Sequence, residues 1–310
     1  MRGVFATGYV DDLAKLAPTT GPLPAIGADE VLVRVRAVAL NPVDVAIATG
    51  KLHKLAPFEF PGVLGWDLSG EVVRVGEGAT AFSPGDAVYA TMGFGGGAFA
   101  EFAAVPADKL AHAPKRLGHP ERAALPLVAC TTIQAMALTD LQPGGRVLVL
   151  GGAGGVGSVA VQWLRHVGVS RVVATASETK LETVRKLGAE VIDYRNEDWS
   201  ERLAGADFDV VYDTVGDRDA PARATKVMRD GGHFVTIAGP AGDAEALGGK
   251  HHFHFCVIKP SATDLAKVTA AVDKGDIDPL IFKRFAFEKI ADAYALCAQR
   301  VAVGKIVVAV

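Results

Sequence analysis

The sequence is poor in cysteine and nearly balanced in charge. Its three cysteines, Cys130, Cys256 and Cys297, are scattered and form no CxxC pair. This pattern predicts no disulfide framework and is typical of a reducing compartment, so we expect a cytoplasmic protein. The formal net charge is only −3, from 32 basic and 35 acidic residues. Such a balance gives no electrostatic reason to expect nucleic acid or an anionic membrane as a partner.

Long apolar runs are also lacking. The most apolar windows are residues 123–138 and 147–164, and polar residues interrupt the first while a run of glycines interrupts the second. Neither window predicts a membrane span. The N-terminal stretch MRGVFATGYVDD has no long apolar segment after its arginine, so we expect no signal peptide.

Half of the residues are hydrophobic, and they follow two different patterns. A chain of 310 residues with this composition predicts a globular protein of two domains. Residues 1–115 carry runs typical of strands, such as EVLVRVRAVAL and SGEVVRVG, which turn signals separate. From about residue 145, short apolar runs such as RVLVLG alternate with helical patterns such as VGSVAVQWLRHVG. This alternation predicts an α/β domain with a parallel sheet covered on both faces.

Five glycines occur in the seven residues GGAGGVG at 151–157. Gly152, Gly154 and Gly157 have the GxGxxG spacing directly after a predicted strand and before a predicted helix, which is the context of a dinucleotide-binding loop. The first glycine permits a tight turn, the second lets the backbone approach a pyrophosphate, and the third lets helix and strand pack closely. The alternative is a glycine-rich turn without a ligand. The predicted phosphate-binding residues are those of the loop: Gly152, Ala153, Gly154, Gly155, Val156 and Gly157.

The second predicted strand of this domain ends at Ala176. An NAD site usually has Asp or Glu at this point, which binds the ribose hydroxyls. Without that carboxylate there is room for a 2′-phosphate, to which Ser177 can donate a hydrogen bond and Lys180 can supply charge. Tyr194 ends the neighbouring strand and can add a hydroxyl. We therefore predict NADPH as the cofactor, although Glu178 lies beside the site and Lys180 has an alternative role as a solvated helix residue.

Several motifs along the chain point to one family. They are ALNPVD (39–44), PGVLGWDLSGEVVRVGEG (61–78), FSPGDAVYA (82–90), ALPLVACTTIQAM (124–136), the AGGVG loop, DVVYDTVG and the closing GKIVVAV. Together these motifs resemble the medium-chain dehydrogenase/reductase superfamily and, within it, the zinc-free quinone oxidoreductases, and the resemblance covers essentially the whole chain. It implies a β-rich GroES-like catalytic domain at 1–118, completed by 260–310, a doubly wound Rossmann domain at 119–259, and an active site in the cleft between them.

The positions that hold zinc ligands in the metal-dependent relatives carry other residue types. The GHE motif is replaced by Gly65-Trp66-Asp67, the first cysteine position falls at or near Asp44, and a second cysteine position is Val128. Zinc needs three or four converging ligands. The histidines of HHFH at 251–254 are interpreted as core or exposed residues rather than as ligands, so we predict no metal.

Without zinc, no Lewis acid stabilises an alkoxide, so simple alcohol oxidation is not expected. Quinones and α,β-unsaturated carbonyls (enones and enals) accept hydride at carbon while charge builds on an oxygen, which needs only hydrogen-bond donors. We therefore expect NADPH-dependent reduction of such small molecules. The resemblance implies that Asn41 and Asp44 face the nicotinamide and the substrate, and that Thr132 contacts the nicotinamide. Asn41 can donate a hydrogen bond to the developing oxyanion, whereas an ionised Asp44 can only accept, so we assign Asp44 a structuring role. A turn residue before Pro42 is the alternative role of Asn41, and the proton donor is left open.

The resemblance also implies which segments line the nicotinamide ribose. These include Val215, the segment from Ile237 to Gly239, and Phe255. Lys305 begins the last predicted strand and is assigned to the cofactor cleft, with a surface lysine as the alternative. Homodimers that pair the edges of Rossmann sheets are common among the similar proteins, so we expect a homodimer.

Two other functions stay open. One is an NADPH-binding protein with a structural or regulatory role and little catalysis, which the joint presence of Asn41, Asp44, Thr132 and the glycine loop argues against. The other is an enoyl-thioester reductase, for which we find no clear basic patch to hold a carrier-linked substrate. A panel of acceptors, tested with NADPH and with NADH, distinguishes these functions.

Overall fold

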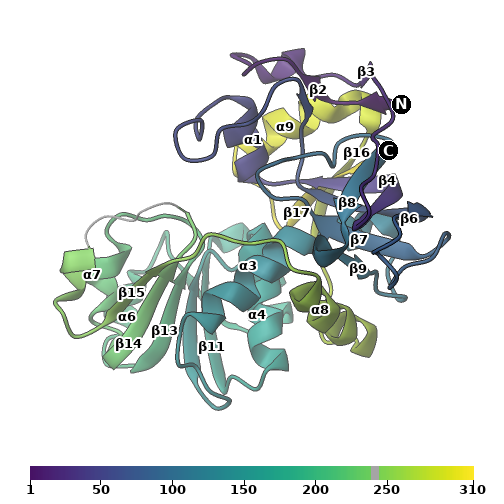
Figure 1. Cartoon of the computed structure of the whole chain (residues 1–310). Helices are drawn as coiled ribbons and strands as arrows, with labels where there is room; N and C mark the ends of the chain where they lie inside the picture. Colours follow the sequence, from purple (N-terminus) through teal and green to yellow (C-terminus); the bar gives the residue numbers. More distant parts are fainter. Residues whose placement is uncertain (239–243) are drawn as a thin grey trace. The chain divides into compact units, whose positions relative to one another are not determined.

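The computed structural model describes residues 1–238 and 244–310. Within these residues the chain divides into two compact units. The chain ends in the unit in which it begins, and in Figure 1 the yellow C-terminal segment accordingly lies among the purple and blue elements of the N-terminal part. The first unit consists of three segments and the second of two: Met1–Cys130, Lys259–Lys274 and Pro279–Val310 in the first, Thr131–Ile258 and Gly275–Asp278 in the second.

The second unit is built on a six-stranded sheet in which every strand pair is parallel. The order is β12-β11-β10-β13-β14-β15, so the chain winds outward in both directions from a switch between β10 and β13. This is the doubly wound order of a dinucleotide-binding sheet, and the predicted Rossmann fold is confirmed. The strands are β10 (Arg146–Leu150), β11 (Arg171–Ala176), β12 (Glu190–Asp193), β13 (Phe208–Asp213), β14 (Met228–Thr236) and β15 (His252–Phe255).

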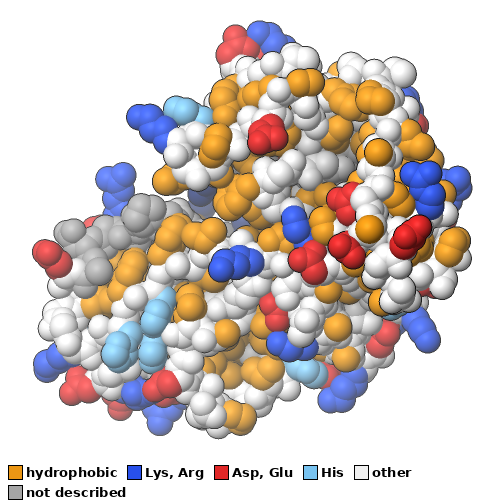
Figure 2. All heavy atoms as spheres, in the orientation of Figure 1, with side chains coloured by type: hydrophobic (Ala, Val, Ile, Leu, Met, Phe, Trp, Pro, Cys, Tyr) orange, Lys and Arg blue, Asp and Glu red, His pale blue; other side chains and the backbone are white. Residues whose placement is uncertain are grey.

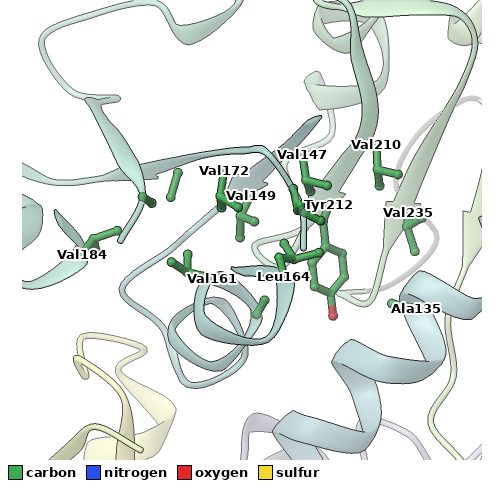
Figure 3. Packing of buried hydrophobic residues seen from close by; sticks show 14 of the residues in the cluster. Ala135, Val147, Val149, Val161, Leu164, Val172, Val184, Val210, Tyr212 and Val235 are labelled. Atoms are coloured by element: carbon green, nitrogen blue, oxygen red, sulfur yellow. The ribbon is translucent and has the colours of Figure 1, made fainter. Parts of the chain in front are cut away.

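Apolar side chains cover both faces of this sheet. Alternate residues of β10 point to opposite faces, so Val147 belongs to one hydrophobic cluster and Leu148 to another. Figure 3 shows the first cluster, in which Val161 and Leu164 of α4 pack beside Val147 and Tyr212 of the sheet. The helices are α3 (Pro126–Ala137), α4 (Gly155–His166) and α5 (Leu181–Lys186) at the first cluster, and α6 (Trp199–Arg202) and α7 (Ala220–Ala224) at the second.

The first unit is β-rich, as expected. Its main sheet has seven strands in the order β16-β17-β4-β6-β7-β9, and β8 pairs with β4 outside this path. Two small antiparallel pairs, β1 with β3 and β2 with β5, lie beside it. The strands are β1 (Arg2–Gly3), β2 (Phe5–Ala6), β3 (Thr19–Thr20), β4 (Glu30–Leu40), β5 (Gly62–Val63), β6 (Asp67–Val75), β7 (Ala87–Thr91), β8 (Phe102–Pro106), β9 (Leu110–His112), β16 (Ile281–Ala286) and β17 (Lys305–Ala309).

The last strand of the chain joins the N-terminal part at β4. Ile306 of β17 lies opposite Leu40 of β4 in antiparallel register. On the other side of β4, Asp67 of β6 lies opposite Ala39. These two registers place the first residues of β17 and β6 on either side of the point where β4 ends.

The boundary between the units lies later in the chain than residue 118, where the sequence analysis places it. Ala123 and Ala124 follow that position, but they are fully buried in a cluster with Ala37, Ala39 and Val307 of the first unit. Their burial fixes α2 (His119–Ala123) and the residue after it to the β-rich sheet. The first unit therefore continues to Cys130.

The helices are short. The longest described, α8 (Ala262–Lys274), has 13 residues, and among the described residues no helix combines the length and the apolar character needed to cross a bilayer. The remaining helices and 3-10 turns are α1 (Pro42–Ala48), α2 (His119–Ala123), α3 (Pro126–Ala137), α8 (Ala262–Lys274), α9 (Ile290–Ala298), and the turns Leu13–Lys15, Ala107–Lys109, Glu178–Lys180, Ala244–Leu247 and Phe287–Lys289.

Candidate active site

The glycine loop connects β10 to α4, as predicted. Gly154 is the residue before the helix, and no side chain of the described residues caps it. The first turn of α4 also contains no acidic residue. At the base of the loop, Gly151 N donates a hydrogen bond to Thr175 Oγ1 at 3.0 Å. An uncapped helix N-terminus carries N–H groups and a partial positive charge that attract phosphate.

The three glycines of the GxGxxG motif, Gly152, Gly154 and Gly157, differ in the space around them. A Cβ on Gly152 would lie 2.6 Å from Ala174 Cβ, and a Cβ on Gly157 would lie 2.2 Å from the carbonyl oxygen of Gly151. The packing of the protein itself therefore requires glycine at both positions. At Gly154 the nearest described atom would be 3.5 Å away, and its φ of −72° is open to any residue. Without a side chain, Gly154 leaves the space beside its backbone open. A pyrophosphate needs this space to approach the backbone closely, so the loop fits a dinucleotide.

The residues predicted to bind the ribose and 2′-phosphate of NADPH lie around the end of β11. Ala176 is buried there and is level with Asp193 of β12, and Tyr194 N donates to Ala176 O at 3.3 Å. Ser177 and Lys180 follow Ala176 in the turn that leads to α5, with Ser177 buried and Lys180 half-buried. The Tyr194 side chain is 51% exposed. The structure therefore brings these predicted residues together at one place on the second unit.

Glu178 of the same turn and Asp193 are carboxylates adjacent to this place, and the oxygens of Asp193 are used within its own turn. Oδ1 accepts a hydrogen bond from Arg195 N at 3.1 Å, and Oδ2 accepts one from Asn196 Nδ2 at 2.8 Å. The side chain is buried. Asp193 thus shapes the turn after β12, and the end of β11 itself carries no carboxylate.

Asp213 holds the predicted nicotinamide-side turn, and the sequence analysis missed it. Its Oδ1 accepts hydrogen bonds from Val215 N at 2.9 Å and Gly216 N at 3.0 Å, and its Oδ2 accepts one from Thr236 Oγ1 at 3.0 Å. Burial raises the pKa of Asp213, and these donors oppose the rise. A Cβ on Gly151 would lie 2.6 Å from Val215 Cγ2, so this turn borders the glycine loop. An acidic residue at the end of a buried strand was the available signal.

The other predicted nicotinamide-side residues follow adjacent strands. Ile237 comes directly after β14, and its N–H donates to Asp213 O at 3.2 Å. Phe255 ends β15 and is partly exposed, opposite Thr236 in the sheet register. Gly239 lies outside the described residues. Val215, Ile237 and Phe255 therefore share the carboxyl edge of the sheet, where doubly wound folds bind their ligands.

In the first unit, Asn41 belongs to a buried polar cluster with Asp67 and Lys305. Asn41 follows the end of β4, and Asp67 and Lys305 are the first residues of the two strands that flank it. Asn41 Nδ2 donates to Asp67 Oδ2 at 2.9 Å, and Lys305 Nζ donates to Asn41 Oδ1, to Leu40 O at 2.9 Å and towards Asp67 Oδ2 at 3.4 Å. Asp67 Oδ1 accepts from Leu127 N at 3.0 Å. Asn41, Asp67 and Lys305 are 2%, 0% and 4% exposed.

This cluster changes the interpretation of Lys305. The alternative of a surface lysine is wrong, because the side chain is buried. The ammonium has three N–H groups, and each faces an acceptor of the first unit. Its predicted contact with the cofactor stays untested, whereas its contact with Asn41 is direct. Asp67 was noted in the sequence only as a missing zinc ligand, and its pairing with Lys305 was not foreseen.

Asp44 begins α1 together with Asn41. Asn41 N donates to Asp44 Oδ2 at 2.7 Å, and Asp44 N donates to Asn41 O at 3.0 Å. This pair of hydrogen bonds fits both the structuring role of Asp44 and the turn role of Asn41. Asp44 Oδ1 is buried and has no hydrogen-bond partner among the described residues. Burial, and after it the charge of Asp67, raises the pKa of Asp44 to about 7.

We expect the parent protein to lose stability as the pH rises towards 7, because Asp44 ionises, and we expect Asp44→Asn to abolish this loss. A carboxyl whose pKa rises from 3.8 to about 7 on folding contributes stability that is complete below about pH 4 and is lost as the pH rises through 7. Asparagine cannot ionise but can still accept from Asn41 N. The free energy of unfolding of the variant, relative to the parent, should therefore increase by about 2 to 3 kcal/mol between about pH 5 and about pH 8. Urea unfolding at both pH values measures it, and an equal difference at the two values would contradict the assignment.

Thr132 lies in α3 and belongs to the second unit, whereas Asn41 and Asp44 belong to the first. Its side chain is fully buried beside the phenol of Tyr212. The predicted contact of Thr132 with the nicotinamide stays a prediction.

His252 and His254 form a stack with His233. The ring of His233 lies 4.8 Å from that of His252 and 5.2 Å from that of His254, with interplanar angles of 28° and 15°. His233 also contacts Asp140, with Nε2 3.0 Å from Oδ1. Figure 2 shows a group of pale-blue histidine side chains gathered at one place on the surface. Across the residues that the structure describes, no group of three or more His, Cys, Asp or Glu side chains is arranged to hold a metal ion.

Two family models match the chain. The alcohol dehydrogenase GroES-like domain matches residues 27–115, and the zinc-binding dehydrogenase model matches residues 187–308. The first match falls in the β-rich unit, and the second extends from the Rossmann sheet into the C-terminal strands.

Named proteins match nearly the whole chain. The 2-methylene-furan-3-one reductase of Solanum lycopersicum is 36% identical over 321 residues, covering 98% of this chain and 78% of that protein. The chloroplastic NADPH-dependent alkenal/one oxidoreductase of Arabidopsis thaliana is 37% identical over 300 residues, covering 92% of this chain and 73% of that protein. The structure of the quinone oxidoreductase from Coxiella burnetii superposes with a TM-score of 0.88 at 25% identity, over 100% of this chain and 99% of that one.

These matches and the geometry of the two units agree with the resemblance seen in the sequence. The parallel sheet has the strand order of a dinucleotide-binding fold, and the β-rich unit includes the C-terminal strand as in the implied catalytic domain. The chain belongs to the zinc-free quinone oxidoreductase branch of the medium-chain dehydrogenase/reductase superfamily and is an oxidoreductase that uses a nicotinamide cofactor.

Proposed function

We propose that the protein transfers hydride from NADPH to quinones and to α,β-unsaturated carbonyls, without zinc. The observation that carries the cofactor assignment is the end of β11, where Ala176 replaces a carboxylate and Ser177, Lys180 and Tyr194 lie together. The substrate class is supported by the relatives, whose names specify an alkenal/one oxidoreductase, a 2-methylene-furan-3-one reductase and a quinone oxidoreductase.

When bound, the cofactor supplies the hydride. The residues of this chain bind and orient the two reactants. The N-terminus of α4 binds the pyrophosphate, and Asp213 fixes the turn at Val215 and Gly216 that orients the nicotinamide end. Asn41 Nδ2 donates to the carbonyl oxygen of the acceptor, where negative charge develops. One proton completes the product, and no side chain of this chain is assigned to supply it.

The zinc-free part of the proposal is based on the residues that occupy the ligand positions. Asp44 uses its side chain to begin α1, and Trp66 is buried with its ring edge-on to Phe94 at 4.9 Å. Val128 is a buried aliphatic residue. Neither an indole nor an isopropyl group can ligate zinc. Reduction of an activated acceptor requires only a hydrogen-bond donor at the oxygen, so no step of this reaction needs the metal.

We expect Lys180→Ala to narrow the preference for NADPH over NADH. A charge-assisted hydrogen bond to the 2′-phosphate contributes about 1.5 to 3 kcal/mol, so its loss should weaken NADPH binding by roughly ten- to hundredfold. NADH lacks that phosphate and should bind the variant and the parent equally. Titration of both proteins with both cofactors measures this. A parent protein with equal affinity for NADPH and NADH would contradict the assignment.

We further propose a cytoplasmic homodimer. The three cysteines are free and buried, which fits a reducing compartment. β15 lies at an edge of the parallel sheet, and a sheet edge offers backbone groups to a second copy. Size-exclusion chromatography with light scattering measures the oligomeric state, and a monomer at micromolar concentration would contradict the dimer.

A further inference from the structure

We propose that Lys305 and Asp67 are positioning residues for Asn41: together they fix the orientation of its amide, so that one N–H of Nδ2 is presented to the carbonyl oxygen of the acceptor. This inference depends on the proposed reduction of quinones and enones. It gives Lys305 a task in the hydride-transfer step through Asn41 rather than through the cofactor.

The chemistry of Lys305 and Asp67 determines where the oxygen and the nitrogen of the Asn41 amide lie. An ammonium can only donate hydrogen bonds, so the atom that faces Lys305 must be the amide oxygen. An ionised carboxylate can only accept them, so the atom that faces Asp67 must be the amide nitrogen. The structure has this arrangement, with Oδ1 towards Lys305 and Nδ2 2.9 Å from Asp67 Oδ2. A flipped amide would place oxygen against oxygen and nitrogen against nitrogen.

One N–H of Nδ2 retains capacity for a ligand. The amide nitrogen has two N–H groups, and Asp67 takes one of them. Nδ2 also lies 3.5 Å from Ala39 O, a distance at the limit of a hydrogen bond. An oxygen that gains negative charge during hydride transfer is a much stronger acceptor than a carbonyl at that distance. The second N–H is therefore the group that can respond to the reaction.

Lys305 also strengthens this donor. Its ammonium hydrogen-bonds to Asn41 Oδ1, which draws electron density from the amide and makes the N–H groups better donors. The cluster is almost completely buried, so water screens this polarisation little. Burial raises the pKa of Asp67, whereas Lys305 opposes the rise and favours the carboxylate that the arrangement needs.

The competing explanation is that Lys305 and Asp67 form a buried ion pair of purely structural importance. The two explanations differ for a protein in which both charges are removed. Buried ion pairs can often be replaced by neutral residues of similar volume without loss of stability. In Asp67→Asn/Lys305→Met, nothing dictates the orientation of the Asn41 amide, because an asparagine at 67 can offer either an oxygen or a nitrogen to it.

The test is a kinetic cycle of four proteins: the parent, Asn41→Ala, Asp67→Asn/Lys305→Met, and the variant with all three changes. Single-turnover hydride transfer from NADPH to a small quinone and to an aliphatic enal is measured for each, with NADPH affinity and melting temperature on the same samples. We expect the pair variant to transfer hydride about tenfold more slowly, with unchanged NADPH affinity and a melting temperature close to that of the parent. Because the pair acts through Asn41, the triple variant should be no slower than Asn41→Ala.

Two results would overturn the proposal. One is a pair variant that transfers hydride at the parental rate. The other is a triple variant whose rate falls by the product of the factors measured for the pair variant and for Asn41→Ala. If the pair variant does not fold, Asp67→Leu/Lys305→Met replaces both charges with apolar residues of similar volume and must show the same slow transfer. A parent protein that reduces neither acceptor would instead reject the proposed function, so the two failures can be distinguished.

Discussion

Gly154→Ala is expected to weaken NADPH binding by about tenfold or more while leaving the melting temperature unchanged. The added Cβ would meet no described protein atom closer than 3.5 Å, and the backbone there is not strained. The protein therefore tolerates the methyl group, and the pyrophosphate does not, because it must approach the backbone at this point. Fluorescence titration with NADPH and thermal unfolding measure the two effects.

Two other glycines are the controls for this change. A Cβ on Gly95 would meet no described atom within 4 Å, so Gly95→Ala should change neither binding nor stability. A Cβ on Gly157 would lie 2.2 Å from Gly151 O, so Gly157→Ala should lower the melting temperature as well as the affinity. Parental affinity of Gly154→Ala for NADPH would show that the loop does not hold the pyrophosphate.

Lys305→Met is expected to lower the free energy of unfolding by about 3 to 5 kcal/mol. It leaves the carboxylate of Asp67 buried without its cation, although Asn41 and Leu127 still donate to it. A second change, Asp67→Asn, removes the unpaired buried charge and should recover most of the lost free energy of unfolding. Urea unfolding of the parent, the single variant and the double variant at neutral pH measures this.

The matched control is Lys289→Met. The Lys289 side chain is 68% exposed, and its nitrogen lies 3.9 Å from an oxygen of the exposed Asp292. Such a surface pair contributes less than about 1 kcal/mol, so the control variant should unfold at nearly the parental urea concentration. If Lys305→Met were as stable as Lys289→Met, the buried pair would carry no net energy.

The sequence predicts the second unit well because its signals are local. The strand, the glycine loop and the helix follow one another within residues 146–166, and short apolar runs of similar length then repeat. A parallel strand buried on both faces is a continuous apolar run, so each strand can be recognised without its neighbours. The residues at the end of β11 could be identified for the same reason, because Ala176 and Ser177 end one such run.

The polar cluster of the first unit could not be predicted in this way. Asn41, Asp67 and Lys305 come together through the registers of β6 and β17 on β4, and Lys305 lies 264 residues after Asn41. Nothing near Lys305 in the sequence distinguishes a buried lysine from an exposed one at the start of a strand. Asp213 was missed for a related reason, because its three donors include Thr236 of the next strand. The domain boundary differs because Ala123 and Ala124 are buried against strands that are distant in the chain.

The most direct test of the account is stopped-flow oxidation of NADPH and of NADH by the chelator-treated protein, with three acceptors: a small quinone, an aliphatic enal and an enoyl thioester. The account predicts rapid oxidation of NADPH by the quinone and the enal, and slower oxidation of NADH at equal concentration. It also predicts that adding zinc does not increase either rate. Tight binding of NADPH without turnover of any acceptor would contradict it and indicate a structural or regulatory protein. A clear preference for the thioester, or activity only with added zinc, would contradict it as well.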